Sequence, residues 1–296
     1  MENHKSSLVT VAIPCYNHAQ YISQSIQSII DQDYENIELV IIDDGSKDDS
    51  VEIIKKFIPI CEKRFKRFEF IARSNKGLCI TLNESIEWSQ GKYFSATASD
   101  DLLHPKKISE QVRAFITHQN NKELVGIFTG LSVIDEHGNV LYVRGRDSYF
   151  GFKEVIRRTA FMPGCAAMFL TIAMKQVGGY NPSYKIEDLY LALKLSNRGG
   201  KFLSIKQPLV FYRRHDDNLS SKSELIWNAV EEILNEYKED YFYKQGLACS
   251  LLIQAHDLQK NSKKKSLLFG GRALKIYPLI IFSRSFFWWF LKFFKL

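Results

Sequence analysis

Short apolar runs alternate with helical patterns over the first hundred residues of the chain. Residues 8–14 (LVTVAIP) and 37–44 (IELVIIDD) are rich in β-branched side chains and end in proline or in carboxylates, which is typical of buried strands. Between them, and again over residues 51–58, isoleucine and valine recur at the three- and four-residue spacing of one helix face. The pattern therefore predicts strand, helix, strand and helix in succession.

The alternation continues with a strand, a helix and a strand over residues 67–73, 78–88 and 92–97. Strands that alternate with helices form a mostly parallel sheet flanked by helices, so we expect a Rossmann-like α/β fold. Beyond Gln119 the pattern changes, and a His-Gly-Asn turn at residues 137–139 between two apolar runs predicts an antiparallel hairpin.

Polar side chains gather where the four predicted strands end. In chain order they are Pro14, Tyr16 and Asn17, then Asp43 and Asp44, then Arg73 and Asn75, and finally Asp100 and Asp101. The carboxyl ends of parallel strands are where α/β proteins bind their ligands. Adjacent carboxylates repel each other, so Asp100 and Asp101 indicate a bound cation or a shared proton. The alternative is a cap on the helix that starts near Pro105.

The strand pattern stops after Leu219. We expect an α/β domain over residues 1–220 and a helical extension over residues 221–296 that ends in an amphipathic tail. A helix from Pro278 would place Arg284, Ser285, Lys292 and Lys295 on one arc and Phe286, Trp289, Phe290 and Phe293 on the other. Charges interrupt this segment before it reaches the ~20 apolar residues of a spanning helix, which favours a position at a membrane surface. The alternative is a C-terminal helix packed on the body of the protein.

The positive charge of the protein belongs to this tail. The 296-residue chain has a formal net charge of +7, yet nine basic residues and no acidic one lie between Lys260 and Leu296, so residues 1–259 carry −2. This distribution argues against a nucleic-acid partner and favours an anionic membrane surface for residues 260–296. Five scattered cysteines and the lack of a secretory signal favour a cytoplasmic protein, peripheral on the inner face of the membrane.

Several motifs, in one order, resemble those of the family 2 glycosyltransferases, nucleotide-sugar enzymes with the GT-A fold. The likeness begins with VTVAIPCYN and DDGSKDDS and continues through RSNKGLCITLN, SDD, GGYNPSYKIEDLYLALKL and YRRHDDNLS, over about residues 8–221. It implies a GT-A fold for the α/β domain. It also implies a nucleotide-sugar donor for the site at the strand ends.

The resemblance implies that Tyr16 stacks on the nucleotide base, although a tyrosine at this position is alternatively part of the core. Asp43 or Asp44 would accept the imide N–H of uracil or thymine, or hold the ribose, because an ionised carboxylate only accepts hydrogen bonds. The further donor-binding positions are Pro14, Asn17, Asn75 and Asn83. The two asparagines after the third strand are weaker candidates, since turn and helix roles explain them equally well.

In the family, a carboxylate motif close to DxDD holds a divalent cation that stabilises the diphosphate leaving group. Here Ala98 occupies the first aspartate position and leaves Ser99-Asp100-Asp101, so fewer carboxylates remain. The resemblance implies that Asp101 binds Mn²⁺ or Mg²⁺ and that Asp100 binds donor sugar or ribose hydroxyls. It makes His215 a further metal ligand, the alternative being a surface histidine.

Glu187-Asp188 matches the ED motif of the family. The resemblance makes Asp188 the general base that takes the proton of the acceptor hydroxyl, and places Glu187 among the donor-binding residues. Without the resemblance, two acids at a helix start are explained by the helix dipole.

Together these features predict an inverting, metal-dependent hexosyltransferase-type enzyme that moves one sugar from a UDP- or dTDP-sugar to a glycan acceptor. The membrane-seeking tail favours a lipid-linked oligosaccharide of surface polysaccharide or lipopolysaccharide O-antigen synthesis. Two alternatives stay open: a non-catalytic module that binds sugar nucleotides or membranes, and a nucleotidyltransferase. The latter would carry a Gly- and Arg/Lys-rich loop after the first strand, which IPCYNHAQ does not resemble.

Overall fold

The computed structural model describes residues 7–184, 186–215, 223–259 and 262–294. They form two compact units, of which the first comprises Met1–Phe150, Phe161–Ser183 and Lys194–His215, and the second Gly151–Ala160, Tyr184–Leu193 and Asp216–Leu296. The expected domain boundary near residue 220 lies outside the described residues.

One ten-stranded sheet organises the first unit. Its strands are β1 (Val9–Cys15), β2 (Ile37–Asp43), β3 (Arg67–Ala72), β4 (Tyr93–Ala96), β5 (Leu102–Leu103), β6 (Leu124–Ile134), β7 (Val140–Arg144), β8 (Ser148–Phe150), β9 (Ala167–Leu170) and β10 (Lys201–Arg213). The order is β3-β2-β1-β4-β9-β6-β10-β5, with β7 on β6 and β8 on β10.

The parallel part of the sheet consists of β3, β2, β1 and β4, together with the β6–β10 pair. The remaining pairs are antiparallel. They include the predicted β6–β7 hairpin, whose short connection allows only an antiparallel pairing. The predicted α/β fold is thus confirmed, with a parallel half and a mixed half.

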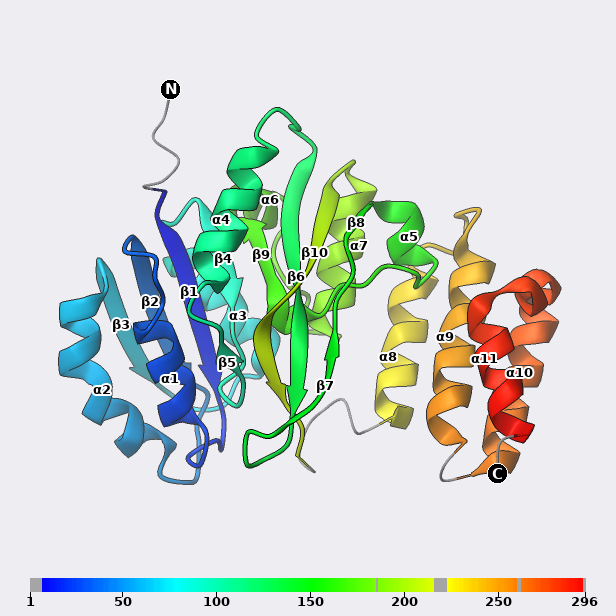
Figure 1. Ribbon diagram of the computed structural model, residues 1–296, viewed down its shortest axis with the longest axis horizontal. Coiled ribbons are helices and arrows are strands. Elements are labelled where there is room, and N and C mark those ends of the chain that lie inside the picture. Colours follow the sequence, from blue (N-terminus) through cyan, green and yellow to red (C-terminus); the bar gives the residue numbers. More distant parts are fainter. Residues whose placement is uncertain (1–6, 185, 216–222, 260–261, 295–296) are drawn as a thin grey trace. The chain divides into compact units, whose positions relative to one another are not determined.

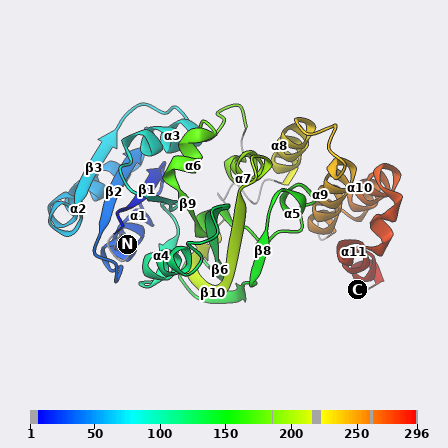
Figure 2. The ribbon, with the colours of Figure 1, turned by 90° about the horizontal axis from the view of Figure 1, so that it is seen from above.

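Helices cover both faces of this sheet (Figures 1 and 2). They are α1 (Ile22–Ile30), α2 (Ser50–Arg64), α3 (Leu78–Trp88), α4 (Lys107–Thr117) and α6 (Thr171–Gln176), with a short 3-10 turn, η2 (Gly164–Ala166). The helices α1 and α4 lie on one face and α3 and α6 on the other (Figure 2). Each of these helices comes directly after a strand in chain order, as the alternating sequence pattern predicts.

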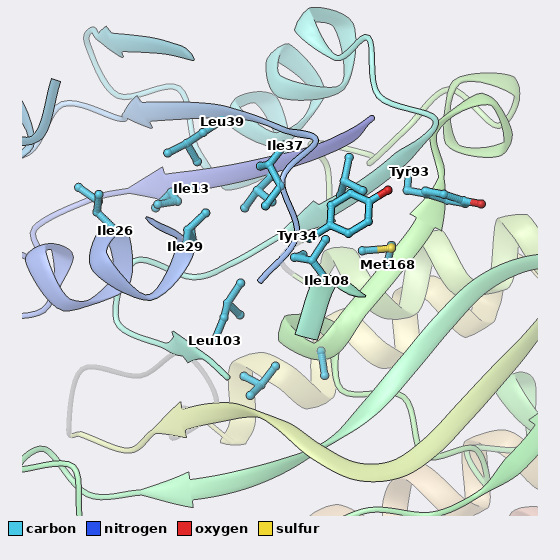
Figure 3. Packing of buried hydrophobic residues seen from close by; sticks show 14 of the residues in the cluster. Ile13, Ile26, Ile29, Tyr34, Ile37, Leu39, Tyr93, Leu103, Ile108 and Met168 are labelled. Atoms are coloured by element: carbon cyan, nitrogen blue, oxygen red, sulfur yellow. The ribbon is translucent and has the colours of Figure 1, made fainter. Parts of the chain in front are cut away.

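The core under α1 and α4 is mainly aliphatic, with a few aromatic side chains (Figure 3). Ile26 and Ile29 of α1 and Ile108 of α4 are fully buried and belong to one cluster with Ile13 and Leu39 of the strands. Burial of each such side chain contributes about 1.5–3 kcal/mol. This packing holds the first two strands in register and so aligns their carboxyl ends.

The second unit is helical. Its elements are α5 (Phe152–Ile156), the start of α7 (Glu187–Asn197), α8 (Ser223–Asn235), α9 (Tyr243–Leu258), α10 (Lys263–Ile276), η4 (Pro278–Phe282) and α11 (Arg284–Phe294). The predicted helical extension is therefore present, but the segment from Pro278 begins as a 3-10 turn and starts anew at Arg284. Among the described residues, no helix has both the length and the apolar character needed to cross a membrane.

A buried carboxylate joins the amino-terminal ends of β1, β2 and β4, opposite the edge where the candidate ligand residues lie. Glu38 of β2 is fully buried and accepts hydrogen bonds from Thr10 Oγ1 (2.6 Å), from the N–H groups of Gln90 (2.7 Å) and Gly91 (2.9 Å), and from Arg67 (3.2 Å). Its charge is stabilised because each carboxylate oxygen has a donor.

We expect Glu38→Ala to lower the free energy of unfolding by about 2–4 kcal/mol, because it leaves buried donors of Thr10, Gln90 and Gly91 without an acceptor. Urea denaturation followed by circular dichroism measures this loss. The matched control is Glu52→Ala, which breaks an exposed Lys55 pair and should cost less than about 0.5 kcal/mol. Equal losses in both variants would contradict the assignment.

Candidate active site

The loops after β1 and β2 are joined by hydrogen bonds at the carboxyl end of the sheet. Asn17 accepts the N–H of Lys47 (2.7 Å) and donates its own N–H to Ser46 Oγ (2.8 Å). One residue on, the N–H of His18 donates to Ser50 Oγ (3.0 Å). Asn17 has a φ of 54°, a left-handed conformation that asparagine tolerates better than most residues. The predicted ligand Asn17 therefore shapes this loop.

Both carboxylates of the DDGS motif have protein partners. Asp43 accepts the N–H groups of Gly45 (3.1 Å) and Ser46 (2.9 Å) and the hydroxyl of Ser46 (2.6 Å). Asp44 pairs with Arg73 and accepts the N–H groups of residues 76 and 77, each at 2.8 Å. In each carboxylate Oδ1 already accepts two hydrogen bonds and Oδ2 accepts one, so Oδ2 can accept a further bond, and base or ribose recognition by either residue stays a prediction.

Gly45 allows the loop after β2 to approach the loop after β3. Its φ is +80°, and a Cβ at this position would lie 2.7 Å from the backbone nitrogen of Asn75. A side chain at this position would therefore push the two loops apart. Asn75 itself is exposed.

The predicted base-stacking residue Tyr16 is 47% exposed at the same edge, so its ring is available to a ligand. Pro14 is part-buried on β1, opposite Ile42 of β2. Asn83 lies in α3, and its amide exchanges two 2.8 Å hydrogen bonds with the backbone of Tyr180. These bonds occupy the polar atoms of Asn83 and give it a role in joining α3 to the GGY turn.

Two histidines and one carboxylate converge beside the SDD motif. One ligand atom from each of His18, Asp100 and His215 lies within 4.8 Å of the other two. His215 Nε2 is 2.9 Å from Asp100 Oδ2, and His18 Nδ1 is 2.7 Å from Ser99 Oγ. The two imidazole rings meet edge to face at 5.8 Å. Two nitrogens and one oxygen at such distances form a donor set that fits a divalent metal ion.

Asp101 has a different environment from its neighbour. It is 1% exposed, and its Oδ1 accepts the N–H of Arg213 (2.8 Å). Burial raises the pKa of Asp101 well above its usual range, the charge of Asp100 raises it further, and the Arg213 N–H and the Cys165 thiol lower it. The other oxygen of Asp101, Oδ2, is buried and has no hydrogen-bond partner among the described residues, so metal binding by Asp101 stays a prediction. Asp100 is the carboxylate that lies next to the two histidines.

The side chain of Arg213 holds this region together. Its Nε donates to the carbonyl of Asp100 (3.0 Å), and its two terminal nitrogens donate to the carbonyl of Glu136 (2.8 Å) and to Gln24 Oε1 (2.8 Å). The guanidinium lies 4.8 Å from the ring centre of Tyr21. One cation thus links α1, the SDD loop and the β6–β7 hairpin.

Glu187 and Asp188 begin α7 in the second unit. Burial, followed by the charge of the neighbouring Asp188, raises the pKa of Glu187 to about 7. Burial also raises the pKa of Asp188, whereas Arg158 lowers it. Arg158 has a φ of 58°, a conformation that costs a non-glycine residue roughly 1 kcal/mol. An aspartate that holds its proton more tightly than usual has the basicity expected of a general base.

The sequence reasoning did not identify His18 or Arg213. Both lie within the motifs of the sequence analysis, as the histidine after IPCYN and as the first arginine of YRRH. Their roles depend on contacts with residues more than eighty positions away, which no local pattern reports.

The glycosyl transferase family 2 profile matches residues 10–178, more than half of the chain. An uncharacterized glycosyltransferase of Rickettsia typhi is 31% identical over 62% of the chain, which spans 57% of that relative. TuaG of Bacillus subtilis, named as a teichuronic acid biosynthesis glycosyltransferase, is 26% identical over 78% of the chain and 88% of its own length. EpsE of Bacillus subtilis, named as a glycosyltransferase, is 29% identical over 73% of the chain and 76% of its own length.

Solved structures show the same fold at low sequence identity. Residues 1–349 of TarS of S. aureus with UDP-GlcNAc align with a TM-score of 0.67 and 15% identity, over 90% of this chain and 79% of that one. The mannosyltransferase PcManGT of Pyrobaculum calidifontis, with GDP-Man and Mn²⁺, aligns with a TM-score of 0.62 and 16% identity, over 95% and 83%. The predicted GT-A fold is confirmed, and the chain belongs to glycosyl transferase family 2.

Proposed function

We propose that the chain is an inverting glycosyltransferase that moves one sugar from a UDP- or dTDP-sugar to a hydroxyl of a lipid-linked oligosaccharide. The name of TuaG supports a role in bacterial surface polysaccharide synthesis. The complexes of TarS with UDP-GlcNAc and of PcManGT with GDP-Man support a nucleotide-sugar donor. A hexose as the transferred sugar fits the same donors.

The observation that carries the proposal is the convergence of His18, Asp100 and His215 at the carboxyl end of the parallel strands. The donor diphosphate gains negative charge as the glycosidic bond breaks, and a divalent cation bound there would stabilise that charge. Two imidazoles disfavour Mg²⁺, which takes oxygen ligands, so the set favours Mn²⁺ or a similar transition ion. The Mn²⁺ in the PcManGT complex supports this choice.

Other residues of this chain would bind the nucleoside and take the proton of the acceptor. Tyr16 offers an exposed ring for stacking on the base, and Asp43 and Asp44 of the DDGS loop each offer a carboxylate lone pair to the nucleoside. Asp188 takes the proton of the acceptor hydroxyl as that oxygen attacks the anomeric carbon. A single displacement of this kind inverts the configuration of the anomeric carbon.

Asp100→Asn and His18→Gln should each weaken Mn²⁺ binding by about tenfold or more and lower transfer by on the order of a hundredfold, because each removes one ligand. Mn²⁺ titration followed by electron paramagnetic resonance, with UDP present, measures the binding. The control His118→Gln changes an exposed histidine at the end of α4 and should have no effect. If Asp100→Asn keeps its Mn²⁺ affinity and Asp101→Asn loses it, then Asp101 is the carboxylate ligand of the metal.

The pH dependence of turnover tests the base. Since the pKa of Asp188 is raised, the ionised form is lost as pH falls through a value above the ordinary ~3.9 of aspartate, and kcat should fall there. Arg158 lowers that pKa, so Arg158→Met should move the acid limb of kcat to higher pH. The neighbouring variant Arg157→Met is the control. An acid limb that does not move, or an Asp188→Asn variant with normal kcat, would exclude Asp188 as the base.

The function as a whole is tested by mixing the protein with Mn²⁺ and a panel of UDP-, dTDP- and GDP-sugars. We expect nucleoside diphosphate release from a UDP- or dTDP-sugar, and a product whose anomeric proton coupling shows inversion. Release from none of the donors, with retained UDP binding, would favour the non-catalytic module. Pyrophosphate release from a nucleoside triphosphate would favour the nucleotidyltransferase.

A further inference from the structure

The last three elements of the second unit expose an apolar surface, here called the apolar face. It consists of Leu267 and Leu268 of α10, Leu279, Ile281 and Phe282 of η4, and Phe287, Trp288 and Phe290 of α11. Phe282 is 82% exposed and Trp288 53%. Eight large apolar side chains within residues 267–290 exceed the scattered exposure that is normal for a protein surface, and such a concentration marks an interaction site.

The helix α11 is anchored to its own unit through the opposite side. Trp289 is buried, and its indole N–H donates to Ser266 Oγ (3.0 Å) while its carbonyl accepts Gln259 Nε2 (2.7 Å). Phe287 and Trp288 lie on the other side of the helix and are more than half exposed. Large aromatic side chains on a solvent-facing side of a helix are uncommon, so this side of α11 is available to a partner outside the described residues.

The charges on the segment that carries the apolar face, residues 262–294, have one sign. Residues 262–294 contain seven basic residues and no acidic one. Lys263 and Lys264 at the start of α10, Lys275 near its end and Arg284 at the start of α11 are all exposed. A purely apolar partner would leave these cations without counter-charges, so the partner that fits is apolar and anionic at once.

We propose that the apolar face binds an anionic lipid bilayer at its headgroup boundary, with the cations of α10 and α11 on lipid phosphates. Aromatic rings prefer this boundary, and the cytoplasmic leaflet carries anionic lipids. A second copy of the chain fits less well, because a symmetric contact through this face would bring two sets of seven cations together. The cytoplasmic surface of the membrane is then where the protein works, independently of which sugar it transfers.

The apolar contribution is tested with Phe287→Ser/Trp288→Ser in the full-length protein. Sedimentation with vesicles of equal parts phosphatidylglycerol and phosphatidylcholine should show binding by the wild type and a loss of about tenfold or more in the variant. The matched control is Val140→Ser/Leu141→Ser in β7, which removes equally exposed apolar side chains from the first unit and should bind normally. Equal binding by both variants would overturn the proposal.

The charge contribution is tested with Lys263→Gln/Lys264→Gln against Lys56→Gln/Lys122→Gln, all exposed lysines. Each cation near the bilayer adds about fivefold to binding, so only the first variant should lose on the order of tenfold, and less in high salt. Vesicles of phosphatidylcholine alone should bind the wild type weakly. Equal affinity for both vesicle types would remove the anionic lipid from the proposal.

Two further measurements separate lipid binding from misfolding and self-association. Brominated lipids should quench the fluorescence of Trp288, and Trp288→Phe should lose this quenching while it keeps vesicle binding. UDP binding should be unchanged in every variant, which shows that the first unit is intact whether or not the protein transfers a sugar. Analytical ultracentrifugation that shows a dimer in the wild type and a monomer in Phe287→Ser/Trp288→Ser, with vesicle binding unchanged, would assign the face to a second copy.

Discussion

The guanidinium of Arg213 is the interaction on which the candidate site depends. It is a buried cation whose donors reach a side chain of α1, the backbone of the SDD loop and the backbone of the β6–β7 turn, and its own N–H holds Asp101. A buried charge is stable only when its hydrogen bonds are satisfied, so these segments must keep their positions for Arg213 to remain buried. The same constraint keeps Asp100 next to His215.

In each of two adjacent pairs of aspartates, the two side chains contact different parts of the protein. In the SDD motif, Asp101 turns inward to the backbone of β10, and Asp100 meets the two histidines. In the DDGS motif, Asp43 closes its own loop and Asp44 binds the loop after β3. Carboxylates that appear as a ligand pair in the sequence therefore also build the loops that would receive the ligand, because two carboxylate oxygens can accept several N–H groups from different segments.

In the C-terminal elements, neighbouring residues likewise differ in burial. Trp289 and Ile280 are buried and hold α11 and η4 in place, whereas their neighbours Trp288 and Phe282 are exposed. The packed helix and the interfacial helix, which the sequence presents as alternatives, are thus both compatible with one segment. Its inner side supplies packing and its outer side supplies a binding surface.

Much of the fold could be predicted from local pattern. The isoleucine spacing of α1, the apolar runs of β1 and β2 and the turn at residues 137–139 each encode their element through side-chain periodicity, which neighbours in the chain determine. The motif order was sufficient to indicate the family. It also located the carboxyl ends of the strands as the place where the chemistry-bearing residues lie.

Tertiary structure decided which of these residues meet. His18 and His215 are almost two hundred positions apart, and only the pairing of the strands and the Arg213 contacts bring both to Asp100. The same contacts bury Asp101, use the amide of Asn83 for the backbone of Tyr180, and leave Trp288 outside while Trp289 is enclosed. Periodicity in a sequence reports which side of an element is apolar, but burial and ligand geometry depend on what packs against that side, and this is a property of the folded chain alone.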